Sequence, residues 1–128
     1  MGTIGAQRWR EFVRSHDSAL LWDSLHPEVV FESPVVHTPQ RGRDVTFKYL
    51  TSVVKILNGP SFRFVGEWTS DTGAVLEFAG EVDGITINGV DIITCDANDR
   101  ITHFKVMVRP LKAINLLHRL MAEQLAKP

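Results

Sequence analysis

The chain has 128 residues, which fits one domain with a single core, and 44% hydrophobic and 23% charged residues are typical of a globular protein. With 14 basic and 15 acidic residues the net charge is −1, which argues against nucleic-acid binding. The single cysteine, Cys95, excludes an internal disulfide and a multi-thiolate metal site and favours the reducing cytoplasm, and no apolar run is long enough to span a membrane.

The first half of the chain has helical periodicity. Trp9 and Val13 are one turn apart, so they share a helix face, and Asp17 or Ser18 can cap a second, short helix that Pro27 should stop. The sequence Asn-Gly-Pro at 58–60 is a strong stop signal for a third helix. We therefore expect, in order, helices at about 5–16 and 18–26, a short strand at 29–31 and a helix at 43–57.

The second half alternates apolar and polar residues with a period of two, which predicts strands. Asp83-Gly84 is the strongest hairpin signal, because glycine tolerates the positive φ of such a turn, and Pro110 suits the start of a last helix. Helices followed by an antiparallel meander indicate a single α+β domain over residues 1–128. The expected elements are strands at about 62–67, 75–79, 85–95 and 100–108 and a helix at 111–125.

Asp91 stands in a strand that is otherwise apolar. Strand parity places Asp91, Ile93 and Cys95 on one face. If this face is concave, burial raises the pKa of the carboxyl group, and the protonated acid can donate a hydrogen bond to a ligand. The alternative is a core aspartate bonded to a hydroxyl group, a backbone amide or Arg109. The sequence leaves both interpretations open.

Other chemistries have little support in the sequence. The five histidines lack the spacing of a zinc motif, the glycines are spaced for turns rather than for a phosphate-binding loop, and no serine stands in a nucleophile elbow. We expect neither a metal nor an organic cofactor.

Two segments carry a resemblance to known families. Residues 90–104, a strand-turn-strand hairpin, and Phe31-Glu32-Ser33-Pro34 resemble the nuclear transport factor 2-like superfamily, which has a cystatin-like fold. Its members include SnoaL-like polyketide cyclases, limonene epoxide hydrolases and ketosteroid isomerases. The resemblance implies a conical α+β barrel, in which a strongly curved antiparallel sheet wraps around N-terminal helices and encloses an apolar cavity, with a C-terminal helix.

The resemblance transfers only part of either catalytic machinery. Asp91 matches the aspartate that donates to the oxyanion in ketosteroid isomerases, while the oxyanion-hole tyrosine falls on or near Trp9. The general base falls on Ser33, whose hydroxyl does not abstract a carbon-bound proton without a base of its own, which argues against steroid-type isomerisation. The last-strand aspartate of the epoxide hydrolases falls near Val106, so their water-activating group is broken.

We predict His37 and Asp91 as a catalytic base and acid, because His37 follows the first strand at the expected cavity mouth. Most of the side chains expected around the cavity are aromatic or aliphatic, and each of these can equally well pack in a core. The predicted binding residues are Trp9, Ser33, Tyr49, Phe78, Phe104 and Val106, with Leu21, Leu25 and Leu76 as further lining.

The leading hypothesis is a SnoaL-like protein that binds a small apolar molecule, with cofactor-free isomerase, cyclase or hydrolase activity. The alternative is a non-catalytic interaction or oligomerisation module, which a cavity below about 100 Å³ would favour. The resemblance also implies a homodimer formed through the convex sheet face, where His103, Lys105 and Met107 lie.

Overall fold

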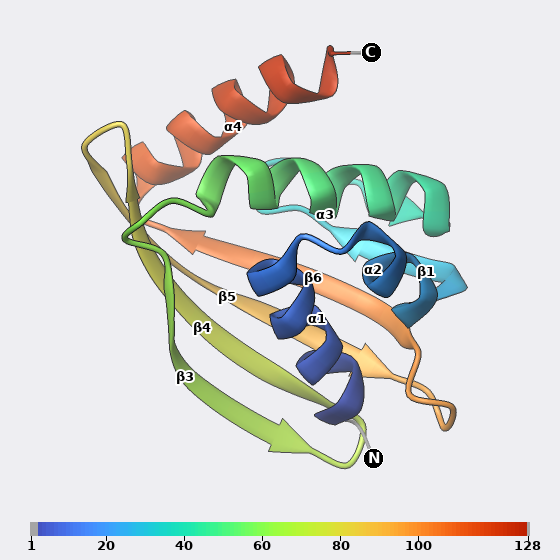
Figure 1. The fold of residues 1–128 in the computed structure, drawn as a ribbon. Helices are drawn as coiled ribbons and strands as arrows, with labels where there is room; N and C mark the ends of the chain where they lie inside the picture. Colours follow the sequence, from blue (N-terminus) through green and yellow to red (C-terminus); the bar gives the residue numbers. More distant parts are fainter. Residues whose placement is uncertain (1–2, 128) are drawn as a thin grey trace.

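The computed structural model describes residues 3–127 and consists of a curved sheet with helices on its concave side (Figure 1). The helices and the sheet form an α+β fold with a C-terminal helix, as expected. The elements are α1 (Thr3–Ser15), α2 (Ser18–Ser24), β1 (Leu25–Glu32), β2 (Gln40–Arg41), α3 (Arg43–Leu57), β3 (Arg63–Ser70), β4 (Gly73–Val82), β5 (Ile85–Cys95), β6 (Ile101–Arg109) and α4 (Leu111–Leu125).

The strand order is β2-β1-β6-β5-β4-β3, so the sheet ends in two separate edges and is open rather than closed into a barrel. Every neighbouring pair is antiparallel except β1 and β6, which are parallel. The expected curved antiparallel sheet therefore includes one parallel pair. Strands β3 to β6 form a meander whose direction reverses at each hairpin. Strand β1 lies beside β6, the last strand of this meander. The long connection that parallel pairing requires lies between β1 and the meander and contains α3.

The region around Pro27 differs from the sequence prediction. Helix α2, whose N-cap Asp17 accepts from the Ala19 N–H, ends at Ser24 rather than at the proline, and β1 begins at Leu25. Pairing of β1 with β6 is irregular between Leu25 and Val30, so Pro27 lies where the ladder needs no N–H donor. The strand therefore accommodates the proline.

The predicted turn signals are confirmed. Asp83 and Gly84 have φ values of 50° and 78°, as expected for a two-residue hairpin turn between Val82 and Ile85. Helix α3 spans Arg43–Leu57, and the Asn58 N–H closes it on the carbonyl oxygen of Val54. These local signals set the register of β4 and β5 and the end of α3, which together border the site described below.

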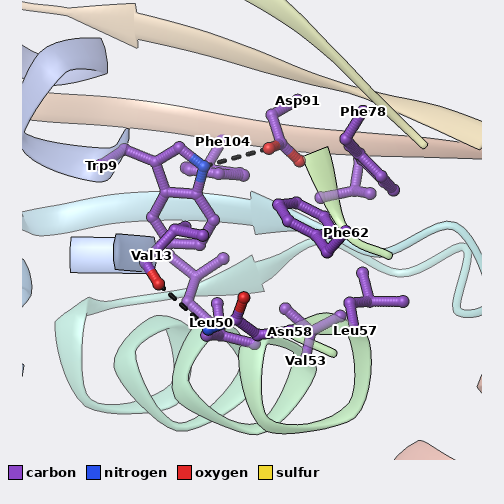
Figure 2. Close-up of a pocket in the computed structure, with 12 residues that line it drawn as sticks. Trp9, Val13, Leu50, Val53, Leu57, Asn58, Phe62, Phe78, Asp91 and Phe104 are labelled. Atoms are coloured by element: carbon purple, nitrogen blue, oxygen red, sulfur yellow. Dashed lines mark hydrogen bonds between the residues drawn. The ribbon is translucent and has the colours of Figure 1, made fainter. Parts of the chain in front are cut away.

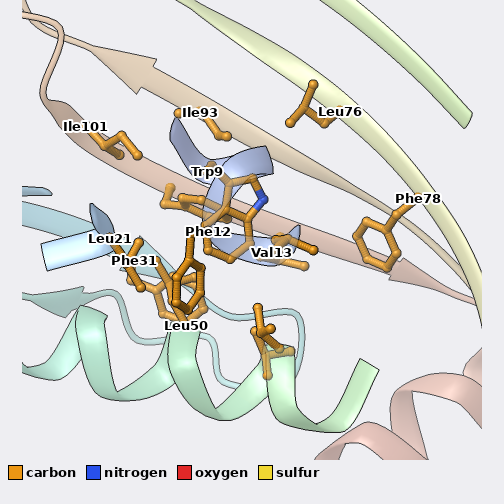
Figure 3. Packing of buried hydrophobic residues seen from close by; sticks show 14 of the residues in the cluster. Trp9, Phe12, Val13, Leu21, Phe31, Leu50, Leu76, Phe78, Ile93 and Ile101 are labelled. Atoms are coloured by element: carbon orange, nitrogen blue, oxygen red, sulfur yellow. The ribbon is translucent and has the colours of Figure 1, made fainter. Parts of the chain in front are cut away.

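The core fills the space between the concave face and α1, α2 and α3 (Figure 3). The Trp9 ring meets the edge of Phe104 with centroids 4.7 Å apart. Helix α4 packs against α3 and the adjoining ends of β5 and β6. No helix within residues 3–127 is long and apolar enough to cross a membrane. The largest buried side chains include Trp9, Phe12, Leu21, Phe31, Leu50, Leu76, Phe78, Ile93, Ile101 and Phe104.

Candidate functional site

Asp91 and Trp9 form a buried polar pair between the sheet and α1. Every second residue of β5 from Ile87 to Cys95 faces the core, so Asp91 points to the concave side and is only 5% exposed. Trp9, 3% exposed, approaches from α1, and its indole Nε1–H donates to Asp91 Oδ2 over 3.0 Å (Figure 2). Strand parity left open whether this face is the concave one, and the structure places it there.

The surroundings of Asp91 favour the neutral acid. Burial in apolar surroundings raises the pKa of this carboxyl group from 3.8 to about 7, and the hydrogen bond from Trp9 opposes part of that rise. Arg109, one of the core partners considered from the sequence, instead donates weakly to Asn88 Oδ1 at 3.5 Å. Near neutral pH the Asp91 carboxyl group is therefore divided between its acid and carboxylate forms.

A small pocket surrounds the Asp91 carboxyl group (Figure 2). Its free volume is about 20 Å³, room for a single water molecule, which is below the threshold of about 100 Å³ for a ligand cavity. At one side the Asn58 amide donates to the Val13 carbonyl oxygen over 3.1 Å. The described lining consists of Trp9, Val13, Leu50, Val53, Val54, Leu57, Asn58, Phe62, Phe78, Asp91, Phe104 and Val106.

Four of the predicted binding residues line this pocket together with Asp91: Trp9, Phe78, Phe104 and Val106. The sequence analysis missed the contribution of α3 and of the segment that follows it. The apolar stripe of α3 was visible as a helix face, but nothing in it indicated a pocket rather than core packing. Asn58 was read only as part of a helix stop, and Phe62 only as the start of a strand.

His37, Ser33 and Tyr49 lie elsewhere. His37 is exposed and, with Ser33, lines a separate open groove beside the end of β6. Ser33 Oγ accepts from the Val35 N–H over 3.1 Å, within its own loop. The structure therefore does not bring His37 to the Asp91 carboxyl group, since the two side chains line different pockets.

Tyr49 stacks on Phe31 with ring centroids 5.4 Å apart and does not line the pocket. Leu21, Leu25 and Leu76 are fully buried in the core and also lie outside the described lining. Within residues 3–127 no group of three or more histidine, cysteine, aspartate or glutamate side chains is arranged to hold a metal ion.

The chain was compared with known proteins. A family model for the SnoaL-like domain matches residues 6–104. No curated protein has a significant match to the sequence. A steroid delta-isomerase structure from Pseudomonas aeruginosa is 31% identical, with a TM-score of 0.90, and the match covers 97% of this chain and 90% of that one.

Two further solved structures are similar. A cystatin-like fold protein from Silicibacter pomeroyi DSS-3 is 28% identical, with a TM-score of 0.86 and coverage of 94% of this chain and 84% of that one. SalBIII, an epoxide hydrolase/cyclase-like enzyme of pyran ring formation in salinomycin, is 17% identical, with a TM-score of 0.64 and coverage of 81% and 86%. The last similarity shows a shared fold.

Proposed function

The chain belongs to the SnoaL-like domain family, and we propose that it binds a small apolar molecule with a carbonyl oxygen in the Asp91 pocket and performs cofactor-free isomerase- or cyclase-type chemistry on it. The observation that carries the proposal is the buried Asp91 carboxyl group, held by Trp9 among apolar side chains. A carboxyl group whose pKa is shifted from its usual value and which lies in a pocket is a common feature of functional sites.

The hydrogen bond from Trp9 determines which oxygen of Asp91 serves the ligand. Oδ2 accepts from the indole N–H, so in the acid form the carboxyl proton sits on Oδ1. There it can be donated to a carbonyl oxygen, and the apolar surroundings strengthen such a hydrogen bond to an oxygen that gains negative charge. Asp91 is the one ionisable side chain in the described lining, so in this proposal it is the group that exchanges a proton with the ligand.

Binding requires the pocket to open, since about 20 Å³ accommodates no ligand of this class. The side that carries Asn58 and Phe62 is the place for this movement. Phe62 is only partly buried, and the Asn58 side chain is held only through its amide nitrogen, which contacts the Val13 carbonyl oxygen and His16 Nε2 at the end of α1. Breaking the bond to Val13 exposes no charge.

The test is a titration with androst-4-ene-3,17-dione, an apolar ketone, between pH 5.5 and pH 8.5. If only the acid form of Asp91 binds, a pKa of about 7 predicts up to roughly 30-fold weaker binding at the higher pH. Asp91→Asn, which keeps a hydrogen-bond donor but does not titrate, should remove this pH dependence. Wild-type affinity that does not change with pH would contradict the role of Asp91.

Catalysis is tested separately with androst-5-ene-3,17-dione, whose conversion to the conjugated enone is followed by ultraviolet absorbance. Ser33 lies outside the pocket and the described lining holds no other base, so turnover that disappears in Asp91→Asn would support isomerase chemistry in which the Asp91 carboxylate itself removes and returns the carbon-bound proton. The small pocket favours a second candidate, a non-catalytic interaction module of the same fold. Absence of both binding and turnover with the two steroids, together with a stable protein complex, would support that candidate.

We further propose that the convex sheet face joins two copies of the chain. The pairing register sets Trp68, Val75, Ile92 and Lys105 in one row across four strands. Trp68 is 59% exposed, and Met107, two residues beyond Lys105 on β6, is 52% exposed, so large apolar side chains lie uncovered on both outer strands of this row. Trp68→Glu should convert a dimer into a monomer in analytical ultracentrifugation, whereas Leu111→Glu, at an exposed apolar residue of α4, should not. A monomeric wild type would refute the proposal.

A further inference from the structure

A surface groove adjoins the Asp91 pocket and leads away from it. The groove lies along α1 and the start of β3, has a volume of about 450 Å³, and is open to solvent. Val13, Asn58 and Phe62 line both the groove and the pocket. Figure 2 shows the hydrogen bond from the side chain of Asn58, which follows α3, to Val13 on α1. A ligand that enters by displacing these three side chains leaves its other end in the groove.

The chemistry of the groove differs from that of the pocket. Its described lining contains three arginines, Arg10, Arg14 and Arg63, and one acidic residue, Glu11. The lining is therefore positive, although the whole chain has a net charge of −1. The pocket, in contrast, contains no basic side chain in its described lining.

Two of these arginines already have carboxylate partners at the surface. Arg10 pairs with Glu67 at 2.7 Å, and Arg14 pairs through Nε and Nη2 with both carboxylate oxygens of Glu11, one turn away on α1. The side chains of Arg10 and Arg14 are 44% and 72% exposed, and ion pairs at such exposure hold their partners weakly.

Arg63 differs from the other two. It donates to the backbone carbonyl oxygen of Ser61 at 3.1 Å, and within residues 3–127 no carboxylate is paired with it. Its charge is therefore available to an anion from outside the chain.

An anionic group is also excluded from the pocket itself. Inside, it would be desolvated next to the Asp91 carboxyl group with no cation within reach, which is strongly unfavourable. Guanidinium groups in the groove, in contrast, can form paired, charge-assisted hydrogen bonds with carboxylate, sulfonate or phosphate oxygens.

On the basis of the proposed function, we infer that the ligand is an amphiphilic anion. Its apolar part enters the Asp91 pocket, and an anionic group at its other end stays in the groove against Arg10, Arg14 and Arg63. The positive groove thus selects acidic ligands over neutral ones of equal size and also attracts them from solution.

The test uses two fluorescent probes with the same aromatic skeleton on the chain of residues 1–128. 1-Anilinonaphthalene-8-sulfonate carries a sulfonate, and N-phenyl-1-naphthylamine lacks it. Arg14→Gln and Arg63→Gln should each weaken binding of the sulfonate about three- to fivefold and leave the neutral probe unchanged. Raising the salt concentration from about 20 mM to about 0.5 M should likewise weaken only the sulfonate. Arg119→Gln, an exposed arginine on α4, is the matched control and should change neither.

Each outcome bears on a defined part of the argument. Both probes could bind while neither the arginine variants nor salt changes the ratio of their dissociation constants. This result refutes the inference that the ligand carries an anionic group in the groove and leaves the proposed binding in the Asp91 pocket intact. If neither probe binds, the apolar pocket of the proposed function is refuted, and the inference with it. Val53→Phe narrows the pocket and should weaken both probes together. If Val53→Phe keeps its affinity for the sulfonate probe and loses its affinity for the neutral probe, the sulfonate probe binds the surface without entering the pocket. This result also refutes the inference.

Discussion

Replacing Asp91 with asparagine tests the central feature of the site, the buried carboxyl group. Asparagine has almost the same size and shape, and its amide oxygen can still accept from the Trp9 indole at the Oδ2 position. The substitution therefore removes the titration of this side chain and keeps its packing. Any fixed effect of the new amide group on stability is independent of pH.

The magnitude follows from the pKa of Asp91, which burial raises from 3.8 to about 7. The folded protein then holds this proton more tightly than the unfolded chain does. The stabilisation from the protonated group is complete below about pH 3.8, decreases as the pH rises, and is lost above about pH 7. At 1.36 kcal/mol per pKa unit the whole change is roughly 4 kcal/mol, of which roughly 3 kcal/mol falls between pH 5 and pH 8.

The assay is urea unfolding of wild type and Asp91→Asn at pH 5, 6, 7 and 8, followed by far-ultraviolet circular dichroism. All other titrating groups are shared, so they cancel in the difference between the two free energies of unfolding. We expect Asp91→Asn to gain roughly 3 kcal/mol of stability relative to wild type over this range. A difference that stays constant within about 0.5 kcal/mol would refute the view of Asp91 as a desolvated, titrating carboxyl group.

Three further substitutions test the surroundings. Trp9→Phe removes the hydrogen bond that lowers the pKa of Asp91, so this pKa should rise above its wild-type value in a carbon-detected NMR titration; an unchanged pKa would contradict the Trp9 contact. Gly73→Ala places a Cβ 1.9 Å from a backbone oxygen of β5 and should lower the free energy of unfolding by about 3 kcal/mol or more. As its control, Gly59→Ala places a Cβ with no atom within 4 Å, and its free energy of unfolding should stay within about 1 kcal/mol of wild type in chemical denaturation. Leu50→Ala should cost about 3 kcal/mol in the same measurement, because Leu50 is fully buried; a loss below about 1 kcal/mol would mean that the site collapses without a cavity.

Local rules placed Asp91 on one face of its strand together with Ile93 and Cys95. The two-residue period of β5 leaves only two faces, but both carry apolar residues, so the sequence did not decide which of them is concave. Asp83-Gly84 likewise specified its turn, because few residues tolerate two successive positive φ values. These features depend on residues near one another in the sequence.

The rest of the site depends on contacts between distant segments. The partner of Asp91, Trp9, is 82 positions away, and the resemblance suggested a donor near that position without giving the contact. Nothing in the local sequence around Asn58 indicates that its side chain reaches α1 and closes one side of the pocket. From the sequence, His37 was expected at the mouth of the cavity because it follows β1. In the structure it lines a different groove, together with Ser33 and residues of β6. Such placements follow from sheet curvature and helix docking, which no short pattern encodes.

The pH-dependent stability and the proposed proton exchange depend on the same group, the Asp91 carboxyl group. At neutral pH the Asp91 carboxyl group costs the fold several kcal/mol relative to a side chain that does not ionise, and total stabilities of small domains are about 5–15 kcal/mol. A purely structural role would need only an acceptor for the Trp9 indole, which asparagine supplies without that cost. What asparagine does not supply is a proton that leaves and returns near pH 7. Suppose that Asp91→Asn gains stability at pH 8 and loses the pH-dependent binding of an apolar ketone. The stability cost of the buried carboxyl group is then explained by the proton that it exchanges with the ligand, and a role in packing alone does not explain why the chain has an aspartate here.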